Sequence, residues 1–163
     1  MANFYKAFIK MQNDPAIKVI PIIISSYGGS VYSLLPMLDL IEASGKPVAT
    51  IALGKAMSCG AVLLASGTKG YRYCAPNADV LVHEVSSFNL GKTSEVSHEA
   101  KQTERLNRLL LVKLEQYSRK PPGWYEKEIA KRKNLDWYIS AKEARRYGLV
   151  DIVSVPNIFR RIC

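Results

Sequence analysis

The sequence has 163 residues, long enough to bury a substantial core, and its hydrophobic content of 48% is ordinary for a globular protein. We therefore predict a single domain over residues 1–163. The formal net charge of +9 would suit a nucleic-acid partner, but no recognition motif accompanies the basic residues. We predict solvated basic helix faces and no nucleic-acid role.

The three cysteines, Cys59, Cys74 and Cys163, lack the close spacing of a metal site and are expected to be reduced thiols. The first residues contain no signal-peptide core, and no apolar run reaches the length that spans a membrane. These features predict a cytoplasmic chain without a membrane partner, a bound metal or an organic cofactor.

Helices and strands alternate along the first half of the chain. We predict helices over residues 3–12, 31–43 and 58–66, and strands over 17–25, 47–53, 71–74 and 79–83. Pro36 fits the second helix only if that helix begins late or is kinked. Apolar strands that alternate with helices predict an α/β fold with a largely parallel sheet, covered on both faces.

Two strand-to-helix turns carry small residues that suit acyl transfer. Gly28 and Gly29 follow the first strand, and adjacent glycines let backbone N–H groups approach a ligand closely. Ser58 follows the second strand, where it can either present its hydroxyl beside free helix amides or simply cap the helix. The N–H groups of Gly29 and Cys59 could together hold a developing oxyanion.

The sequence offers two histidines as a general base for Ser58. His83 ends the predicted strand over 79–83, a position that is either structural or catalytic, whereas His98 lies in a polar helical stretch and is expected to be solvated. Spacing does not select the carboxylate that would orient the base. Four aspartates remain open at this point: Asp39, Asp79, Asp136 and Asp151.

The second half of the chain is mostly helical. A helix over 93–117, capped by Thr93 or Ser94, is polar in its first half and apolar in its second, so we expect one half to project and the other to pack. Pro121 and Pro122 end it, and a basic helix over 124–133 follows. A capping box at Ser140 and a stop at Gly148 bound a last helix.

Several segments, in one order, resemble the ClpP-type serine peptidase family, the proteolytic subunit of the Clp protease. The resemblance runs from about residue 18 to 153 and is carried by residues 26–31, 54–67, 71–83 and 135–151. The separation of 25 residues between Ser58 and His83 is typical of that family. Ordered motifs of this kind are far more specific than one serine between glycines.

The resemblance implies the ClpP/crotonase-type α/β fold, with mostly parallel sheets, flanking helices and a projecting handle helix over about 93–117. It implies a catalytic triad of Ser58, His83 and Asp136, with the Gly29 and Cys59 N–H groups as the oxyanion hole. The implied function is a serine endopeptidase that acylates Ser58 and then hydrolyses the acyl-enzyme, without a metal or cofactor. Cys59 is then structural.

The resemblance also implies how substrate and partners bind. Residues 85–90 are expected to form an extra strand, beside which the family adds the peptide as a further strand. This makes four residues substrate-binding: Val85, Ser86, Ser87 and Phe88. The expected assembly is a homo-oligomeric ring, single or stacked in pairs, that encloses polypeptide substrates. A Clp-type ATPase unfoldase is the partner implied by the family.

Departures from the family pattern modify these expectations. The sequence begins at what resembles the family's first body helix, without the segment that forms axial pore loops, which favours ATPase-independent cleavage. Leu135 stands where relatives usually carry an arginine that links assembly to activity, which favours a single ring. Tyr27 replaces a proline and Cys59 a methionine, and neither change removes an N–H group.

Three alternatives remain open beside the ATPase-coupled peptidase. The first is a self-standing, ATPase-independent enzyme such as a phage head-maturation protease, and the second is an inactive ring-scaffold subunit. The third is a CoA-binding relative with the crotonase fold. Fluorophosphonate labelling separates the active enzyme from the scaffold, and a CoA-thioester binding test addresses the third.

Overall fold

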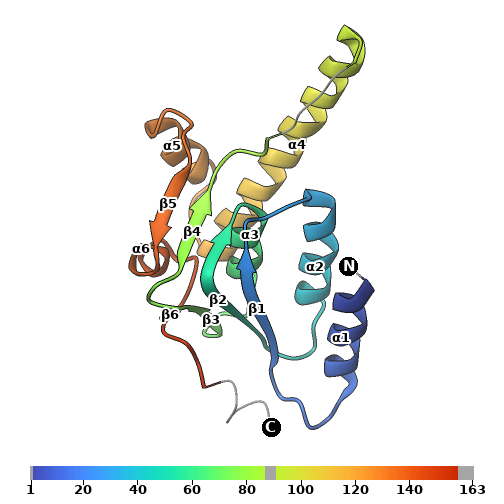
Figure 1. Ribbon diagram of the computed structural model, residues 1–163, viewed down its shortest axis with the longest axis vertical. Helices are drawn as coiled ribbons and strands as arrows, with labels where there is room; N and C mark the ends of the chain where they lie inside the picture. The colour runs from blue at the N-terminus through green and yellow to red at the C-terminus, as the bar shows by residue number, and fades with distance from the viewer. Residues whose placement is uncertain (1, 87–90, 158–163) are drawn as a thin grey trace.

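The computed structural model describes residues 2–86 and 91–157 (Figure 1). Helices and strands alternate through the first half, and helices dominate the second. Their bounds are α1 Ala2–Asn13, β1 Ile20–Ser26, α2 Val31–Glu42, β2 Val48–Met57, α3 Cys59–Ala65, β3 Arg72–Cys74, β4 Asp79–Val82, α4 Thr93–Ser118, α5 Trp124–Lys131, β5 Trp137–Ser140, α6 Ala141–Tyr147 and β6 Ile152–Val153.

Strand β2 is the centre of the sheet. It pairs in parallel with β1 along one side, and along the other with β3 and then β4. Ile24 pairs with Ala52 but Ser26 pairs with Ala56, so β2 carries two extra residues, and Gly54 with φ +74° lies among them. β6 extends the sheet in parallel beside β3, and β5 pairs antiparallel with β4. The prediction of a mostly parallel α/β fold is confirmed.

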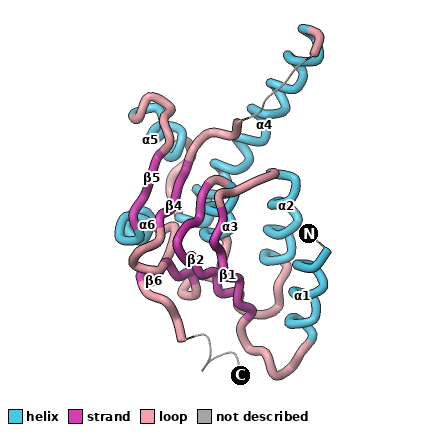
Figure 2. Tube along the Cα trace, viewed as in Figure 1, coloured by secondary structure: helices cyan, strands magenta, loops and turns pink. Residues whose placement is uncertain are grey.

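The helices cover the sheet and enclose an apolar core. Figure 2 shows the strands between α1 and α2 on one side of the view and α5 and α6 on the other. The short helix α3 packs on β2 and on α4, and its Leu64 is fully buried. Burying a leucine or isoleucine side chain contributes roughly 1.5–3 kcal/mol, so this apolar interior supplies most of the stabilisation.

Helix α4 has two different halves, as its sequence predicts. Its 26 residues span roughly 39 Å, and Figure 1 shows the first half extending away from the body. Residues 93–101 are all exposed, whereas four leucines of the second half are buried against the core. The predicted caps Thr93 and Ser94 are wrong by one and two positions. Lys92 is the N-cap, and its N–H donates to the Glu95 carboxylate at 3.0 Å.

Several local expectations differ from the structure. Helix α2 begins at Val31, as predicted, with Pro36 inside it. Of the two alternatives for Pro36 the late start is therefore ruled out, and the Tyr32 carbonyl lacks its usual donor. The extra strand is wrong for Val85 and Ser86, which belong to no strand, while residues 87–90 lie outside the described part. β5 was not expected, because four residues give too short a pattern.

The predicted capping box of α6 is confirmed. The Ser140 side chain accepts a hydrogen bond from the Glu143 N–H at 3.4 Å, and Glu143 accepts one from the Ser140 N–H at 3.0 Å. Gly148 ends the helix in the left-handed conformation, with φ +83°. Across residues 2–86 and 91–157, none of the helices is both long enough and apolar enough to cross a membrane.

Candidate active site

Ser58 lies at the carboxyl end of β2 in a strained backbone conformation. Its φ of 54° and ψ of −122° are rare for a residue with a side chain and cost roughly 1–3 kcal/mol. The Ser58 N–H donates to the Leu81 carbonyl at 2.9 Å, which ties the turn to β4. Although Ser58 is the N-cap residue of α3, its hydroxyl makes no capping hydrogen bond. The strained turn therefore leaves the hydroxyl available.

The Gly28–Gly29 turn packs directly against Ser58. A Cβ at Gly28 would lie 2.7 Å from the Ser58 Cβ and 2.9 Å from the Met57 carbonyl, so no side chain fits there. A Cβ at Gly29 would meet nothing within 4 Å, so the space in front of this residue is open. The Cys59 N–H belongs to the first turn of α3, where helical amides lack a helical partner. Two backbone donors thus border an open space beside Ser58.

Strand register brings His83 and Asp136 together. Val82 of β4 pairs with Trp137 of β5 in an antiparallel ladder, so the next residues along, His83 and Asp136, are also opposite each other. The His83 Nδ1 lies 3.8 Å from the Asp136 Oδ1, an ion-pair separation longer than a hydrogen bond. The Asp136 side chain is 56% exposed and the His83 side chain 26%.

The other aspartates are engaged elsewhere or lie at a distance from His83. Asp151 accepts hydrogen bonds from Arg72 Nε at 2.9 Å and Nη2 at 2.6 Å, in a bidentate pair. Asp79 begins β4, four residues before His83, so roughly 13 Å of strand separates them. Asp39 belongs to α2 and contributes to the electrostatics of Tyr117. Of the four candidates left open by spacing, Asp136 is the one beside His83.

A cavity of about 260 Å³ lies between α4 and the residues around Ser58 and His83. Ser58, Cys59 and His83 line one side of it, together with Gly29. Residues of α2 and α4 line the rest, namely Val31, Tyr32, Glu99, Gln102, Thr103 and Leu106, with Ser30, Val85 and Ser86. Of the predicted substrate-binding residues, Val85 and Ser86 line this cavity, whereas Ser87 and Phe88 lie outside the described residues. His98 is exposed on α4 and does not line the cavity.

Helix α4 also holds the segment after His83. The Val85 N–H donates to the Asn107 Oδ1 at 3.0 Å. Sequence reasoning missed Asn107 and the α4 residues of the cavity. The sequence did contain a pattern that indicates the α4 residues of the cavity. Glu99, Gln102 and Leu106 are spaced three and four residues apart and so share one helix face.

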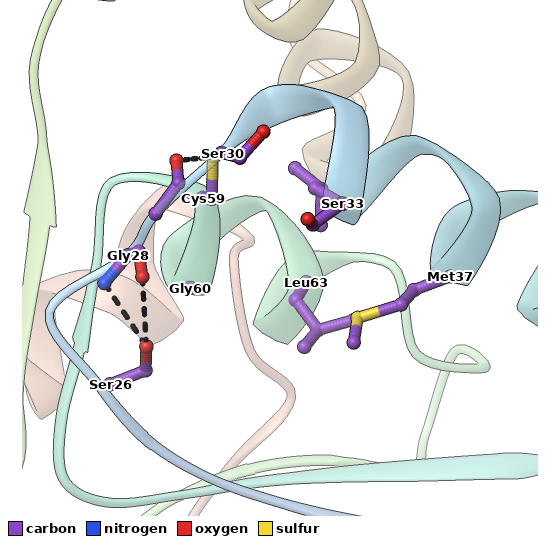
Figure 3. A pocket seen from close by; sticks show the side chains of 10 residues that line it. Ser26, Gly28, Ser30, Ser33, Met37, Cys59, Gly60 and Leu63 are labelled. Carbon is purple, nitrogen blue, oxygen red and sulfur yellow. Dashed lines mark hydrogen bonds between the residues drawn. The ribbon is translucent and has the colours of Figure 1, made fainter. Parts of the chain in front are cut away.

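The Cys59 thiol is hydrogen-bonded to the backbone of the glycine turn. It is buried and donates to the Gly29 carbonyl at 3.1 Å, as Figure 3 shows at the edge of a second cavity that also contains Ser33, Met37 and Leu63. Burial raises the pKa of the Cys59 thiol, and it raises that of Cys74 to about 11, so both stay protonated near neutral pH. The thiolate that attack by Cys59 would require is disfavoured.

The site consists of backbone amides, a hydroxyl, an imidazole and a carboxylate. Within residues 2–86 and 91–157, no three His, Cys, Asp or Glu side chains gather closely enough to hold a metal ion. Hydroxyl, imidazole and carboxylate in this order are the groups of nucleophilic acyl transfer, and neighbouring amides can stabilise the oxyanion that forms.

Comparison with known proteins agrees with this class of site. Residues 2–157 match the Clp protease family, and the chain therefore belongs to that family. A relative, the ATP-dependent Clp protease proteolytic subunit 3 of Nocardia farcinica, is 38% identical over 132 residues. The aligned region covers 80% of this chain and 58% of the relative, so the chain spans less than two thirds of that protein's length.

Proposed function

We propose that this chain is a serine endopeptidase that hydrolyses peptide bonds in unfolded proteins or peptides. The observation that carries the proposal is the meeting of three chain segments at one edge of the sheet. Ser58, with an uncapped hydroxyl, lines the same cavity as His83, and His83 lies 3.8 Å from Asp136. Membership of the Clp protease family supports the same reaction class.

In the proposed mechanism, His83 removes the proton of Ser58 as the oxygen attacks the peptide carbonyl. The N–H groups of Gly29 and Cys59 hold the oxyanion, and His83 then protonates the departing amine. Water then hydrolyses the acyl-enzyme: His83 removes a proton from the water and afterwards returns it to the Ser58 oxygen. Asp136 orients the imidazole and stabilises its charged form, and the separation of 3.8 Å is expected to shorten when substrate closes the site.

The proposed assembly is a homo-oligomeric ring that encloses the active sites. Support comes from α4, whose first half is exposed over residues 93–101 and extends away from the body (Figure 1). The relative's name describes an ATP-dependent proteolytic subunit, and we extend to this chain a Clp-type ATPase as the partner for folded substrates. Degradation of a folded protein only in the presence of such an ATPase and ATP tests this partnership.

Ser58→Ala tests the nucleophile. Peptide hydrolysis should fall by at least about 10³-fold, because the other triad members cannot replace the attacking oxygen. Fluorophosphonate should label Ser58 in the wild-type protein, as located by peptide mass spectrometry. Ser66→Ala is the matched control, since the Ser66 hydroxyl donates to the Leu63 carbonyl at 2.8 Å at the other end of α3.

The control should keep both hydrolysis and labelling. Activity of Ser58→Ala within tenfold of the wild type would refute the assignment, as would labelling at Cys59. A wild-type protein that assembles but takes no label would favour the inactive scaffold subunit.

A further inference from the structure

The cavity beside Ser58 has a polar wall that the proposed mechanism does not use. Glu99, Gln102 and Thr103 of α4 face Ser58 and His83 across it. A substrate whose carbonyl carbon meets the Ser58 oxygen, with its oxygen toward Gly29, must place the neighbouring side chain close to this space. The walls of the cavity can therefore discriminate between substrate side chains that enter it.

The side-chain amide of Gln102 in this wall is already hydrogen-bonded at both its nitrogen and its oxygen. The Gln102 Nε2 donates to the Tyr32 hydroxyl at 2.6 Å, and the Gln102 Oε1 accepts from the Arg105 Nε at 3.0 Å. This chain of hydrogen bonds holds the Tyr32 ring at the cavity, where the residue remains 59% exposed. An aromatic face and two apolar residues, Val31 and Leu106, are therefore available to a substrate side chain.

Glu99 is the charged group of this wall. Its side chain makes no hydrogen bond or ion pair with residues 2–86 or 91–157, because the bond that Thr103 donates goes to the Glu99 backbone carbonyl at 2.9 Å. Among the described residues that line the cavity, none is a lysine or an arginine. A carboxylate, an aromatic ring and apolar side chains that line one cavity are a combination that accepts a long cationic side chain.

We propose that this cavity selects arginine or lysine on the acyl side of the scissile bond, with Glu99 and Tyr32 as the specificity-determining residues. The inference rests on the proposed function, since it assumes that substrate carbonyls meet Ser58. The side-chain stem lies along Val31 and Leu106, the Glu99 carboxylate accepts hydrogen bonds from the cation, and the Tyr32 ring contacts it from the side.

The test compares two peptides that differ only in arginine or citrulline at this position. Citrulline has nearly the same shape but no charge. We expect kcat/KM to favour arginine about tenfold, as for a partly solvated charge-assisted hydrogen bond. Glu99→Gln should reduce the ratio to within about twofold, and Glu99→Lys should invert the preference, so that a glutamate peptide is cleaved faster than a glutamine peptide.

Glu104→Gln is the matched control, because Glu104 lies on the same helix but does not line this cavity. It should keep the wild-type ratio, and sedimentation should show that all variants share one native mass. Equal rates for arginine and citrulline would overturn the proposal, and so would an unchanged ratio in Glu99→Gln.

A binding experiment separates this inference from the proposed function. On the Ser58→Ala variant, the dissociation constants of the same two peptides should again favour arginine about tenfold, with no chemistry involved. Equal affinities would overturn the cation-accepting cavity. A tenfold binding preference in a chain whose wild-type form hydrolyses neither peptide would uphold the cavity and refute the peptidase.

Discussion

At the residue scale, the Arg72–Asp151 pair is the most deeply placed charge pair of the structure's described part. The Arg72 side chain is 1% exposed, and its Nη1 also donates to the Tyr117 carbonyl at 3.0 Å. The Asp151 carboxylate additionally accepts the Gly70 N–H at 2.7 Å. The pair thereby fastens the start of β3 to the end of α4 and to the segment before β6.

Removing one partner of this pair should be strongly destabilising. Asp151→Asn leaves a buried guanidinium without a counter-charge, and we expect a loss of about 3–5 kcal/mol in the free energy of unfolding, measured by urea denaturation. Lys69→Gln is the matched control, because the Lys69 Nζ lies 3.6 Å from the same carboxylate but its side chain is 53% exposed. It should cost less than about 1 kcal/mol. Equal losses would contradict the role given to burial.

The same pair predicts a pH dependence of stability. Burial opposes ionisation of Asp151, but hydrogen bonds from Arg72 and Gly70 outweigh it and lower its pKa from 3.8 to about 2. A carboxyl whose pKa is depressed by folding stabilises the protein above its unfolded pKa. That contribution, about 2 kcal/mol before solvent screening reduces it, disappears as the pH falls from about 4 to 2. Asp151→Asn should lack this part of the acid dependence.

At the element scale, α4 supports both the core and the site. In the second half of α4, Leu114 is 2% exposed and the helix packs against α3 and α5. Asn107 and Glu99 lie further toward the N-terminus of the helix. The packed half thus anchors Glu99, which lines the cavity beside Ser58, and Asn107, which accepts a hydrogen bond from the Val85 N–H.

Leu114→Ala should create a cavity where the second half of α4 packs on the body. We expect a loss of about 2–5 kcal/mol in the free energy of unfolding, because a buried leucine loses its transfer energy and its contacts. Ile9→Ala, on the exposed face of α1 where Ile9 is 51% exposed, should change stability by no more than about 0.5 kcal/mol. A leucine variant as stable as the wild type would show that α4 is not anchored through this residue.

At the scale of the whole molecule, the projecting half of α4 presents an exposed surface over residues 93–101. Val96 is 37% exposed there, and Leu135 and Tyr138 are 66% and 60% exposed near Asp136. Exposed apolar side chains on a projecting element fit contacts with further copies of the chain. This arrangement is consistent with the proposed ring.

Sedimentation should therefore give a particle several times heavier than the 18.2 kDa chain. Val96→Asp should shift the distribution to smaller species, because the interface would have to bury an unpaired charge. An unchanged urea unfolding curve would separate lost assembly from lost folding. A wild-type monomer that cleaves long substrates at full rate would contradict the ring and remove the need for an enclosed chamber.

Much of the site could be anticipated from local sequence. Glycines at 28 and 29, a serine at a strand-to-helix turn and a histidine at a strand end are short-range features, because backbone sterics act between neighbouring residues. The same holds for the capping box of α6 and for the divided character of α4, whose periodicity can be counted along the chain. The alternation of apolar strands and helices was enough to predict a largely parallel sheet.

Only the tertiary structure decided which residues from distant parts of the chain lie beside one another at the site. Asp136 is 53 residues beyond His83, and only the antiparallel register of β4 and β5 brings the two together, with β5 itself too short to be predicted. Burial of Arg72 explains why Asp151 is engaged elsewhere, and the packing of α4 against the body brings Glu99 to the cavity that Ser58 lines. These outcomes arise from packing between segments far apart in the chain, and such contacts leave no periodic or local signal in the sequence.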